Sequence, residues 1–469
     1  MKLYLSLISF IAITLCQGQN KQLLYNVNEL PQTLMNNPGA NTTFKAHIGI
    51  PLFSQFHFSA GSSGADLHDI FDDSNPNINQ RVINTINRLT NKDYFTATEQ
   101  LEILSFGWRL NKDHYFSAGV YQEMDAFSYF PKDPAILVAE GNIDYINRPF
   151  DFSDVAFTGE VLAVYHMGLN RIVNQKLTIG GRIKVYSGIF NVESINNTGT
   201  FLTRRTPNGS NYYMHHVQNL DVRVNTSGFA TLRDDSDTQT VQDASKSLLQ
   251  KSLFGGNIGG GLDIGATYKI RENLEVTGSV LDLGLIYHRK DVENYTYEGS
   301  YETSGIEPLF PEIGPDGRAF PYWDEFEDEV DRNLKDETLN EAYMTWRPFK
   351  VNASLEMRFG EIIVPCDYRI RSKRKFHSKG GIHVFGIKRP GTVKYALSGY
   401  YDRRITQNLR MKVAYTFDDF SYTNLGLLAS TNFKTFNFYL AADNLLGYFN
   451  LAKSRYQSVQ FGFQFIVPE

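Results

Sequence analysis

The final stretch of the chain, residues 457–467, alternates strictly between apolar and polar side chains. Its apolar face consists of Val459, Phe461, Phe463 and Phe465, and the opposite face consists of serine, glutamine and glycine. A period of two residues is that of a β-strand, whose successive side chains point to opposite sides. A strand with one apolar and one polar face suits a membrane barrel, because one face meets lipid and the other meets a polar lumen.

Alternating segments of this kind recur along the chain and are joined in pairs by short polar turns. The turns are rich in Asn, Asp and Lys, which tolerate the tight conformations that connect antiparallel neighbours. They lie at residues 111–113, 174–176, 271–273, 406–408 and 431–432. Long stretches that we expect to be irregular separate the hairpins, at residues 61–100, 124–154, 191–256 and 289–346. Short turns at one end and long loops at the other indicate an outer-membrane barrel with periplasmic turns.

We therefore predict an all-β fold, a closed antiparallel transmembrane β-barrel of about fourteen strands, with twelve and sixteen as the neighbouring even counts. The predicted strands are residues 44–60, 101–110, 114–123, 155–172, 176–190, 257–270, 273–288, 347–359, 378–388, 392–405, 408–417, 421–430, 433–442 and 455–467. Pro51 is expected to kink the first strand. A phase slip near Val280 predicts a β-bulge that turns Asp282 inward.

The start of the chain has the features of an export signal over residues 1–18. An apolar run at 3–15 precedes small residues, so we expect the mature chain to begin with an N-terminal segment at 19–43, followed by the barrel at 44–469. Two alternatives are a membrane anchor, for which the apolar run is short, and a lipoprotein attached through Cys16. Together with the barrel pattern, the export signal predicts a location in the cell outer membrane.

Composition supports this class of protein and excludes others. Lys and Arg number 46 against 51 Asp and Glu, a balance that gives no sign of nucleic-acid binding. Aromatic residues make up 14% of the chain, with 34 Phe and 27 Tyr, as expected for the aromatic girdles of a barrel. Once the signal is removed, Cys366 is the single cysteine, so an intramolecular disulfide is excluded.

Charged residues on the polar faces of the strands belong in the lumen, because a charge on the lipid face costs about 2–4 kcal/mol near the midplane. The basic residues predicted to line the lumen are Arg109, Arg182, Lys184, Lys269, Lys350, Arg358, Lys394, Arg410 and Lys412. The acidic ones are Glu160, Asp263, Asp282, Glu356 and Asp402. One hypothesis is a basic lumen that selects anionic solutes or carboxylate-headed amphiphiles. The alternative, which we favour, is that these charges pair and fill a narrow polar core.

Several fragments, taken in order, carry a resemblance to a known family. They are residues 30–32 (LPQ), 37–38 (NP), 130–133 (FPKD), 140–142 (EGN), 281–284 (LDLG) and 443–446 (DNLL). Across nearly the whole mature chain they resemble an uncharacterised outer-membrane barrel family of the Bacteroidota, a domain of unknown function. That family is distantly similar to the long-chain fatty-acid transporter barrels and to the shuttle barrel of type IX secretion. The family usually has Asn-Pro-Ala near its start, whereas here Gly39 follows Pro38.

The kinship with fatty-acid transporter barrels implies an N-terminal plug that folds into the lumen. The matching segment here is residues 19–43, whose apolar candidates for lumen contacts are Leu23, Leu24, Tyr25 and Leu30. The alternative is a frayed periplasmic tail. The sequence by itself leaves both open.

The sequence offers no enzymatic signature. It contains no H-E-x-x-H metal helix and no G-x-S-x-G nucleophile elbow. The glycine-rich run at 255–261 lacks the Lys-Ser/Thr of a phosphate-binding loop and precedes an alternating strand. His215 and His216 are adjacent in a long loop, but metal binding there needs further ligands that the sequence does not show. We therefore expect neither an enzyme nor a bound cofactor.

Two functions remain for such a barrel. The first is transport of a small hydrophobic or anionic molecule, which requires a lumen cavity in the range of ligand sites, roughly 300–1,000 Å³. The second is a structural or accessory role in protein secretion, surface attachment or gliding, with contacts on the loops at 191–256 and 289–346. The expected partners are outer-membrane lipid, the barrel-assembly machinery and, for the accessory role, secretion or surface proteins.

A secreted β-sandwich is the rival fold, because its strands also show one apolar face. A second sheet would have to cover that face, and the turns of a sandwich would not sort into a short end and a long end. The regular sorting of the turns therefore favours the barrel.

Overall fold

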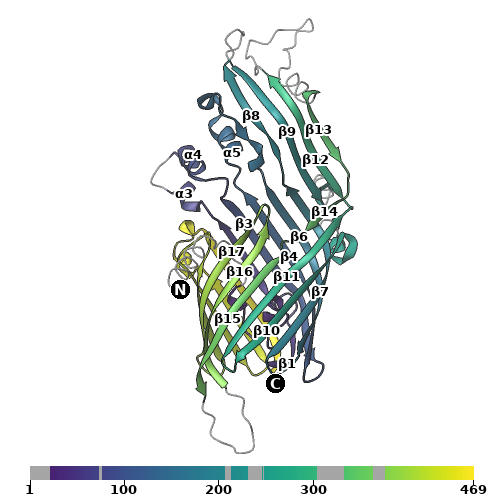
Figure 1. The fold of residues 1–469 in the computed structure, drawn as a ribbon, viewed down its shortest axis with the longest axis vertical. Helices are drawn as coiled ribbons and strands as arrows, with labels where there is room; N and C mark the ends of the chain where they lie inside the picture. The colour runs from purple at the N-terminus through teal and green to yellow at the C-terminus, as the bar shows by residue number, and fades with distance from the viewer. Residues whose placement is uncertain are drawn as a thin grey trace, which may run out of the picture.

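The computed structural model describes residues 22–72, 77–205, 213–230, 246, 248–303, 332–362 and 375–468. The expected export signal, Cys16 and Cys366 lie outside these ranges. Within them, fourteen antiparallel wall strands close into one barrel, which confirms the predicted fold class (Figure 1). No described helix is long and apolar enough to cross a membrane.

The ring of wall strands follows the order of the sequence. The strands are β1 (Phe44–Gly49) continued by β2 (Phe56–Ser62), β3 (Tyr94–Arg109), β4 (His114–Tyr129), β6 (Phe157–Ile172), β7 (Leu177–Ser194), β10 (Asn257–Arg271), β11 (Leu274–His288), β14 (Tyr343–Trp346) continued by β15 (Lys350–Ile362), β16 (Lys375–Arg389), β17 (Thr392–Arg404), β18 (Leu409–Phe417), β19 (Asn424–Phe433), β20 (Phe436–Asp443) and β21 (Tyr456–Pro468). Each predicted strand overlaps one of these. β3 and β4 extend about six residues further toward the long loops than predicted.

The barrel closes between its first and last strands. Both β1 and β2 pair with β21 on one side and with β3 on the other. Residues 50–55 interrupt the first strand at Pro51, whose ring removes a backbone donor from the ladder, so the predicted kink is confirmed. Closure leaves this ring without a free edge.

The two faces of the wall are inverted relative to a soluble protein. In β21, the polar residues Ser458, Gln460 and Gln464 are buried, whereas Phe465 and Val467 are exposed. The same alternation holds in β15, where every second residue is exposed and apolar. Apolar side chains therefore cover the outside of the barrel and polar side chains fill the inside, as contact with lipid requires.

Most of the short turns gather at one end of the barrel, called here the short-turn end, whereas the β16–β17 turn at 390–391 lies at the opposite end. Four predicted turns join neighbouring wall strands at the short-turn end, at 111–113, 174–176, 271–273 and 406–408. The fifth prediction, 431–432, was wrong by three residues, because these residues continue the ladder between β19 and β20 and the turn falls at 434–435. A further connection at this end, 363–374, lies outside the described residues.

At the opposite, long-loop end, much of what we expected to be irregular is ordered. β8 (Thr198–Arg205), β9 (Tyr213–Ser227), β12 (Val292–Thr303) and β13 (Leu334–Leu339) form a sheet that rises above the barrel as a continuation of its wall (Figure 1). The short β5 (Phe150–Asp151) pairs with β8. The prediction missed these strands although β9 alternates at Leu220, Val222 and Val224, and two of these residues pair with tyrosines of β12.

Short helices complete this end and the interior. They are η1 (Gln22–Leu24), α2 (Thr33–Asn36), α3 (Leu67–Phe71), α4 (Ile78–Arg88), α5 (Lys132–Glu140), η2 (Ile143–Tyr145), η3 (Phe152–Asp154), η4 (Lys251–Gly255), η5 (Leu445–Phe449) and η6 (Leu451–Lys453). η1 and α2 belong to the segment inside the barrel, and the others stand at the long-loop end.

Candidate functional site in the barrel lumen

The N-terminal segment, residues 22–43, runs inside the barrel, where side chains of the wall satisfy its backbone. Lys412 donates to the carbonyl of Tyr25 at 2.7 Å. Asn170 donates to the carbonyls of Pro38 at 2.7 Å and Ala40 at 2.9 Å. Buried carbonyls need such partners, and a barrel interior can supply them only from its side chains. Basic and amide residues of the wall are therefore engaged by the segment.

The apolar side chains of the segment pack against the inner face of β17 to β20. Leu23, Leu24, Tyr25 and Leu30, which the resemblance singled out, are each no more than 3% exposed. The cluster that holds the three leucines also contains Val27, Tyr400, Ala414, Leu428, Tyr439 and Ala441. Burial of such side chains stabilises a seated segment by roughly 1.5–3 kcal/mol each before the cost of ordering is subtracted.

Three glycines let the segment touch the wall where it meets β7 and β10. A Cβ on Gly180 would lie 2.0 Å from the carbonyl oxygen of Pro38, and one on Gly265 would lie 2.1 Å from Oδ1 of Asn37. A Cβ on Gly39 would lie 2.3 Å from the carbonyl oxygen of Gly265. Only glycine allows backbones to approach this closely. The contact gives a physical reason for a glycine after Pro38.

Between this segment and the long-loop end lies a cavity of about 670 Å³, called here the inner chamber. Its apolar lining includes Ile195, Leu283, Met344, Trp346 and Phe349. Its charged lining includes Asp125, Glu160, Glu193, Asp282, Arg347, Lys388 and Arg389. The volume lies within the range of small-molecule sites, and mostly apolar walls with a few polar groups are typical of them.

The buried guanidinium groups of the chamber are already paired with carboxylates. Arg347, 3% exposed, forms ion pairs with Glu160 and, at 3.2 Å, with Glu123. Arg389 donates two hydrogen bonds to Asp125, at 2.6 and 3.0 Å. Two-point pairing of this kind is the strong form of a charged hydrogen bond. The two buried cations of the chamber are therefore already engaged, and the third cation of its lining, Lys388, is exposed.

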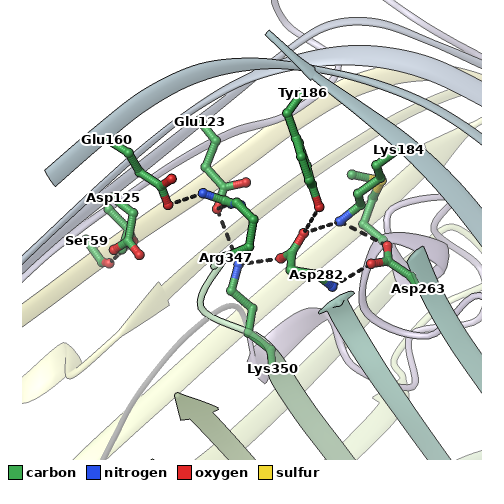
Figure 2. A network of polar contacts seen from close by, with 12 residues as sticks. Ser59, Glu123, Asp125, Glu160, Lys184, Tyr186, Asp263, Asp282, Arg347 and Lys350 are labelled. Atoms are coloured by element: carbon green, nitrogen blue, oxygen red, sulfur yellow. Dashed lines mark hydrogen bonds and ion pairs between the residues drawn. The ribbon is translucent and has the colours of Figure 1, made fainter. Parts of the chain in front are cut away.

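From the chamber, a chain of ion pairs leads across the lumen toward the N-terminal segment (Figure 2). Lys350 contacts Glu123 at 3.3 Å and Asp282 at 2.9 Å. Lys184 contacts Asp282 at 2.5 Å and Asp263 at 3.0 Å. Each inner carboxylate of this chain thus faces two cations, which offsets much of the desolvation cost of burying it.

The chain of ion pairs ends on helix α2. Arg182 donates to Asp263 at 2.7 Å and also to the carbonyls of Leu34, at 3.2 Å, and Met35, at 2.9 Å. The predicted bulge beside this site is confirmed, because the β10–β11 register shifts opposite Asp263. The bulge places Asp282 in the left-handed region with φ +59° and turns its carboxylate inward.

A second ion cluster lies lower in the barrel, on β15 to β17. Glu356 is fully buried and accepts a hydrogen bond from Tyr400 at 2.9 Å, with Arg358 at 3.3 Å and Lys379 at 3.4 Å. Arg358 also contacts Glu275 at 2.7 Å. Here too the predicted lumen charges pair with one another.

The remaining predicted residues line the lumen near its ends. Arg410 contacts Asp402 at 2.7 Å and also pairs with Glu29 of the N-terminal segment. Arg109 donates to the hydroxyl of Thr42 at 3.0 Å. At the same end, Lys269 is half-buried.

The wall between β11 and its neighbour is interrupted beside the inner chamber. β11 pairs with β15 up to Leu281 and with β14 from Leu285 onward. Residues 282–284 and 347–349 form no ladder pairs with each other, apart from one bond from the Arg347 amide to the Gly284 carbonyl at 2.9 Å. The bulge on one strand and a proline, which has no N–H, on the other account for this wall gap.

The inner chamber extends into the wall gap. Besides inward-facing groups, its lining includes Leu283 and Met344, which are exposed on the outer face, and Trp346, which is 76% exposed. A cavity lined from both faces of a barrel wall joins the lumen to the outside surface. The residues at the junction are apolar.

A second cavity, of about 760 Å³, forms a vestibule at the long-loop end. Ile195 and Pro390 line both cavities, so the vestibule adjoins the inner chamber. The hydroxyl of Tyr129 donates to the carbonyl of Pro390 at 2.9 Å, which ties β4 to the β16–β17 turn across the mouth. Lys394 lines the vestibule, 3.4 Å from Asp419.

Comparison with known proteins identifies the family. The model of a family of unknown function, DUF5723, matches residues 38–443. The chain belongs to this family. No curated protein matches it in sequence.

Several solved structures are similar to the chain. The toluene transporter TodX of Pseudomonas putida has a TM-score of 0.38 and 9% identity over 92% of each chain. A FadL homologue of Pseudomonas aeruginosa has a TM-score of 0.42 and 11% identity over 97% of each chain. The translocator domain of the autotransporter NalP from Neisseria meningitidis has a TM-score of 0.29 and 8% identity, covering 91% of this chain and 89% of the other.

The sequence did not lead us to predict several of the charged residues that line the lumen. Glu123 stands at the end of its predicted strand, and Asp125 and Arg389 lie just beyond theirs. Arg347 lies next to the wall gap, where strict alternation fails. Lys379 was within a predicted strand and on its inward phase, so the alternation itself could have found it. With these five residues, bases still outnumber acids in the set, because three of the five are basic.

The adjacent histidines in the sheet above the barrel have ordinary partners. His215 contacts the hydroxyl of Thr203 at 2.9 Å, and His216 contacts Glu302 at 2.8 Å. Within the described ranges, no three His, Cys, Asp or Glu side chains gather in a way that could hold a metal ion.

Proposed function

We propose that this protein is an outer-membrane transport barrel for small hydrophobic molecules. The observation that carries the proposal is the inner chamber, a ligand-sized cavity whose apolar walls continue into the wall gap. Its volume and lining suit a compact apolar ligand. The outward-facing apolar surface of the strands supports a location in a lipid bilayer.

The pairing of the charges supports hydrophobic over anionic cargo. An anion in the chamber would have to displace Glu160 or Glu123 from Arg347, or Asp125 from Arg389. Displacement would leave a buried carboxylate without its partner, which costs several kcal/mol. An apolar molecule needs none of these charges and gains from contact with the apolar wall.

The N-terminal segment supports a route that does not run straight through the barrel. Residues 22–43 occupy the lumen between the inner chamber and the short-turn end, and wall side chains hold them. We propose that the segment is a plug. Cargo that enters the vestibule then reaches the chamber and leaves through the wall gap, where apolar residues meet the bilayer.

Uptake of a matched pair of probes tests the proposal. Cells that carry the protein in their outer membrane are given radiolabelled naphthalene or naphthalene-2-sulfonate, which differ by one anionic group. Naphthalene uptake should exceed that of cells with Thr158→Trp, because Thr158 lines the chamber and the larger side chain fills it. Thr423→Trp, on an exposed loop, is the control and should match the natural protein.

Two results would contradict the proposal. One is naphthalene uptake that Thr158→Trp leaves unchanged. The other is faster uptake of the sulfonate than of naphthalene, which would favour an anion-selective lumen.

The sheet above the barrel favours an accessory role as the second candidate. β8, β9, β12 and β13 rise above the barrel from the pairing of β9 with β7 (Figure 1). They add no lining to the inner chamber. An ordered platform on a rigid barrel is where recognition residues collect. Recovery of a secretion or surface protein with the natural protein, and its loss when residues 198–227 and 292–339 are removed, would support this role.

A further inference from the structure

A group of exposed apolar side chains stands at the rim of the barrel on α3, η5 and η6, called here the rim knob. Its exposed apolar members are Leu67, Phe71, Leu446, Tyr448, Phe449 and Leu451. Phe449 is 88% exposed. A contiguous patch of large apolar residues on a protein surface marks an interaction site rather than an accident of folding.

The rim knob is firmly built, so its apolar side chains are held outward by structure. The hydroxyl of Tyr448 donates to the carbonyl of Ser458 on β21 at 2.9 Å. The side-chain amide of Asn444 donates to the backbone carbonyl of Tyr456 at 2.7 Å. α3 packs against η6. The side chain of Asp69 on α3 also pairs with α4.

The position of the rim knob continues the apolar outside of the barrel. Ser458, which Tyr448 contacts, directly precedes Val459, the apolar residue of β21 nearest the long-loop end. Val459 pairs with Phe58 of β2, which is exposed on the outer face. The rim knob is therefore the next apolar surface beyond the lipid-facing row of β2 and β21. Figure 1 shows η5 and η6, in yellow, at the side of the rim below α3.

Basic residues flank the apolar group on the same connection. Lys453 and Arg455 are both exposed, and each follows η5 within a few residues. Apolar and aromatic side chains next to exposed cations are typical of segments that lie in the head-group region of a bilayer, where the cations meet phosphates.

We propose that the rim knob is an interfacial anchor that inserts Phe449, Leu451 and Leu446 into the head-group layer of the surrounding membrane. The occupant of this surface is thus a lipid surface and neither a partner protein nor a second copy of the chain. The anchor fixes one side of the long-loop end to the bilayer. It depends on the membrane location in the proposed function and is independent of the cargo.

Nitroxide accessibility tests the anchor in the full-length protein. Spin labels are placed singly at Phe449→Cys, Val138→Cys and Leu440→Cys, with Cys16 and Cys366 replaced by serine, in phosphatidylcholine–phosphatidylglycerol vesicles. Val138, on α5, is 89% exposed and lies outside the rim knob, and Leu440 lies on the outer wall. Heat-modifiable mobility on a gel confirms that each labelled barrel is closed.

The expected result is that the label at 449 collides several-fold more with oxygen than with a water-soluble nickel chelate, relative to the label at 138. Equal ratios at 449 and 138 would overturn the anchor, and exclusion of both reagents at 449 would overturn it in favour of a protein partner or a second copy. The label at 440 separates the two proposals. If it too is in water, the membrane location fails, whereas a lipid-exposed 440 with an aqueous 449 refutes the anchor alone.

Discussion

Single residues decide how the N-terminal segment sits in the lumen. Wall side chains hold the segment mainly by donating hydrogen bonds to its backbone carbonyls, as Arg182 does to Leu34 and Met35. Glycines contribute by having no side chain at all. The position of the segment therefore depends on the missing side chains of these glycines as much as on the hydrogen bonds from the wall.

Gly180→Ala should loosen the N-terminal segment. The added Cβ would meet the carbonyl of Pro38 at 2.0 Å, and overpacking of this kind costs about 1–3 kcal/mol. Proteolysis within residues 22–43 should then be faster by roughly fivefold to a hundredfold. Gly181→Ala is the matched control, because its Cβ would lie 3.8 Å from the nearest atom. Equal cleavage rates for the two variants would contradict the close contact.

Asp282→Asn should destabilise the barrel strongly. Removal of this charge leaves Lys184 and Lys350 with one fewer carboxylate partner each, and loss of one partner from a buried ion pair costs about 3–5 kcal/mol. Urea titration followed by tryptophan fluorescence measures the free energy of unfolding. Asp336→Asn, on the exposed β13, serves as control and should change it by less than about 0.5 kcal/mol. A loss below about 1 kcal/mol for Asp282→Asn would show that the network is weak.

At the scale of elements, the outward and inward faces of the wall strands could be predicted because lipid imposes a strict alternation. The turns at the short-turn end followed from Asn and Lys between alternating runs. The sheet of β8, β9, β12 and β13 was missed, although the alternation of Leu220, Val222 and Val224 in β9 carries a strand signal. The wall gap also escaped prediction, since it depends on how two irregularities on neighbouring strands meet.

For the charges in the lumen, the inward direction could be predicted from the sequence but the pairing could not. Alternation placed residues such as Lys184 and Asp263 on the inward phase, and the structure finds them side by side. Which charge pairs with which depends on the register between strands and on the bulge at Asp282, and neither can be read from one strand alone. The residues that the prediction missed include acids at strand ends, such as Glu123 and Asp125, and bases such as Arg347.

Deletion of residues 22–43 should open the barrel to ions. The natural protein should conduct poorly in planar bilayers, because the segment fills the lumen toward the short-turn end and its charges are paired with the wall. The deleted protein should show larger and steadier single-channel currents. A protein that carries the deletion and shows heat-modifiable mobility, but conducts no better than the natural one, would contradict a plugging role.

On the scale of the whole molecule, the features of the barrel lie at different levels along its axis. Its lower lumen is filled by its own chain, its middle holds the inner chamber and the wall gap, and its upper end carries the vestibule and the sheet. The family could be recognised from the order of short fragments. The location of the chamber could not, because it is formed by residues from six strands that lie far apart in the sequence.

The seat of the N-terminal segment sets the order in which the molecule is completed. Residues 22–43 are synthesised before any strand, yet their partners are spread from β3 to β21, as Arg109 and Gln464 show. The earliest part of the chain can therefore settle only after the latest part has arrived. A newly exported chain must build a cylinder around its own beginning, and a ring that closed with those residues left outside would be hollow.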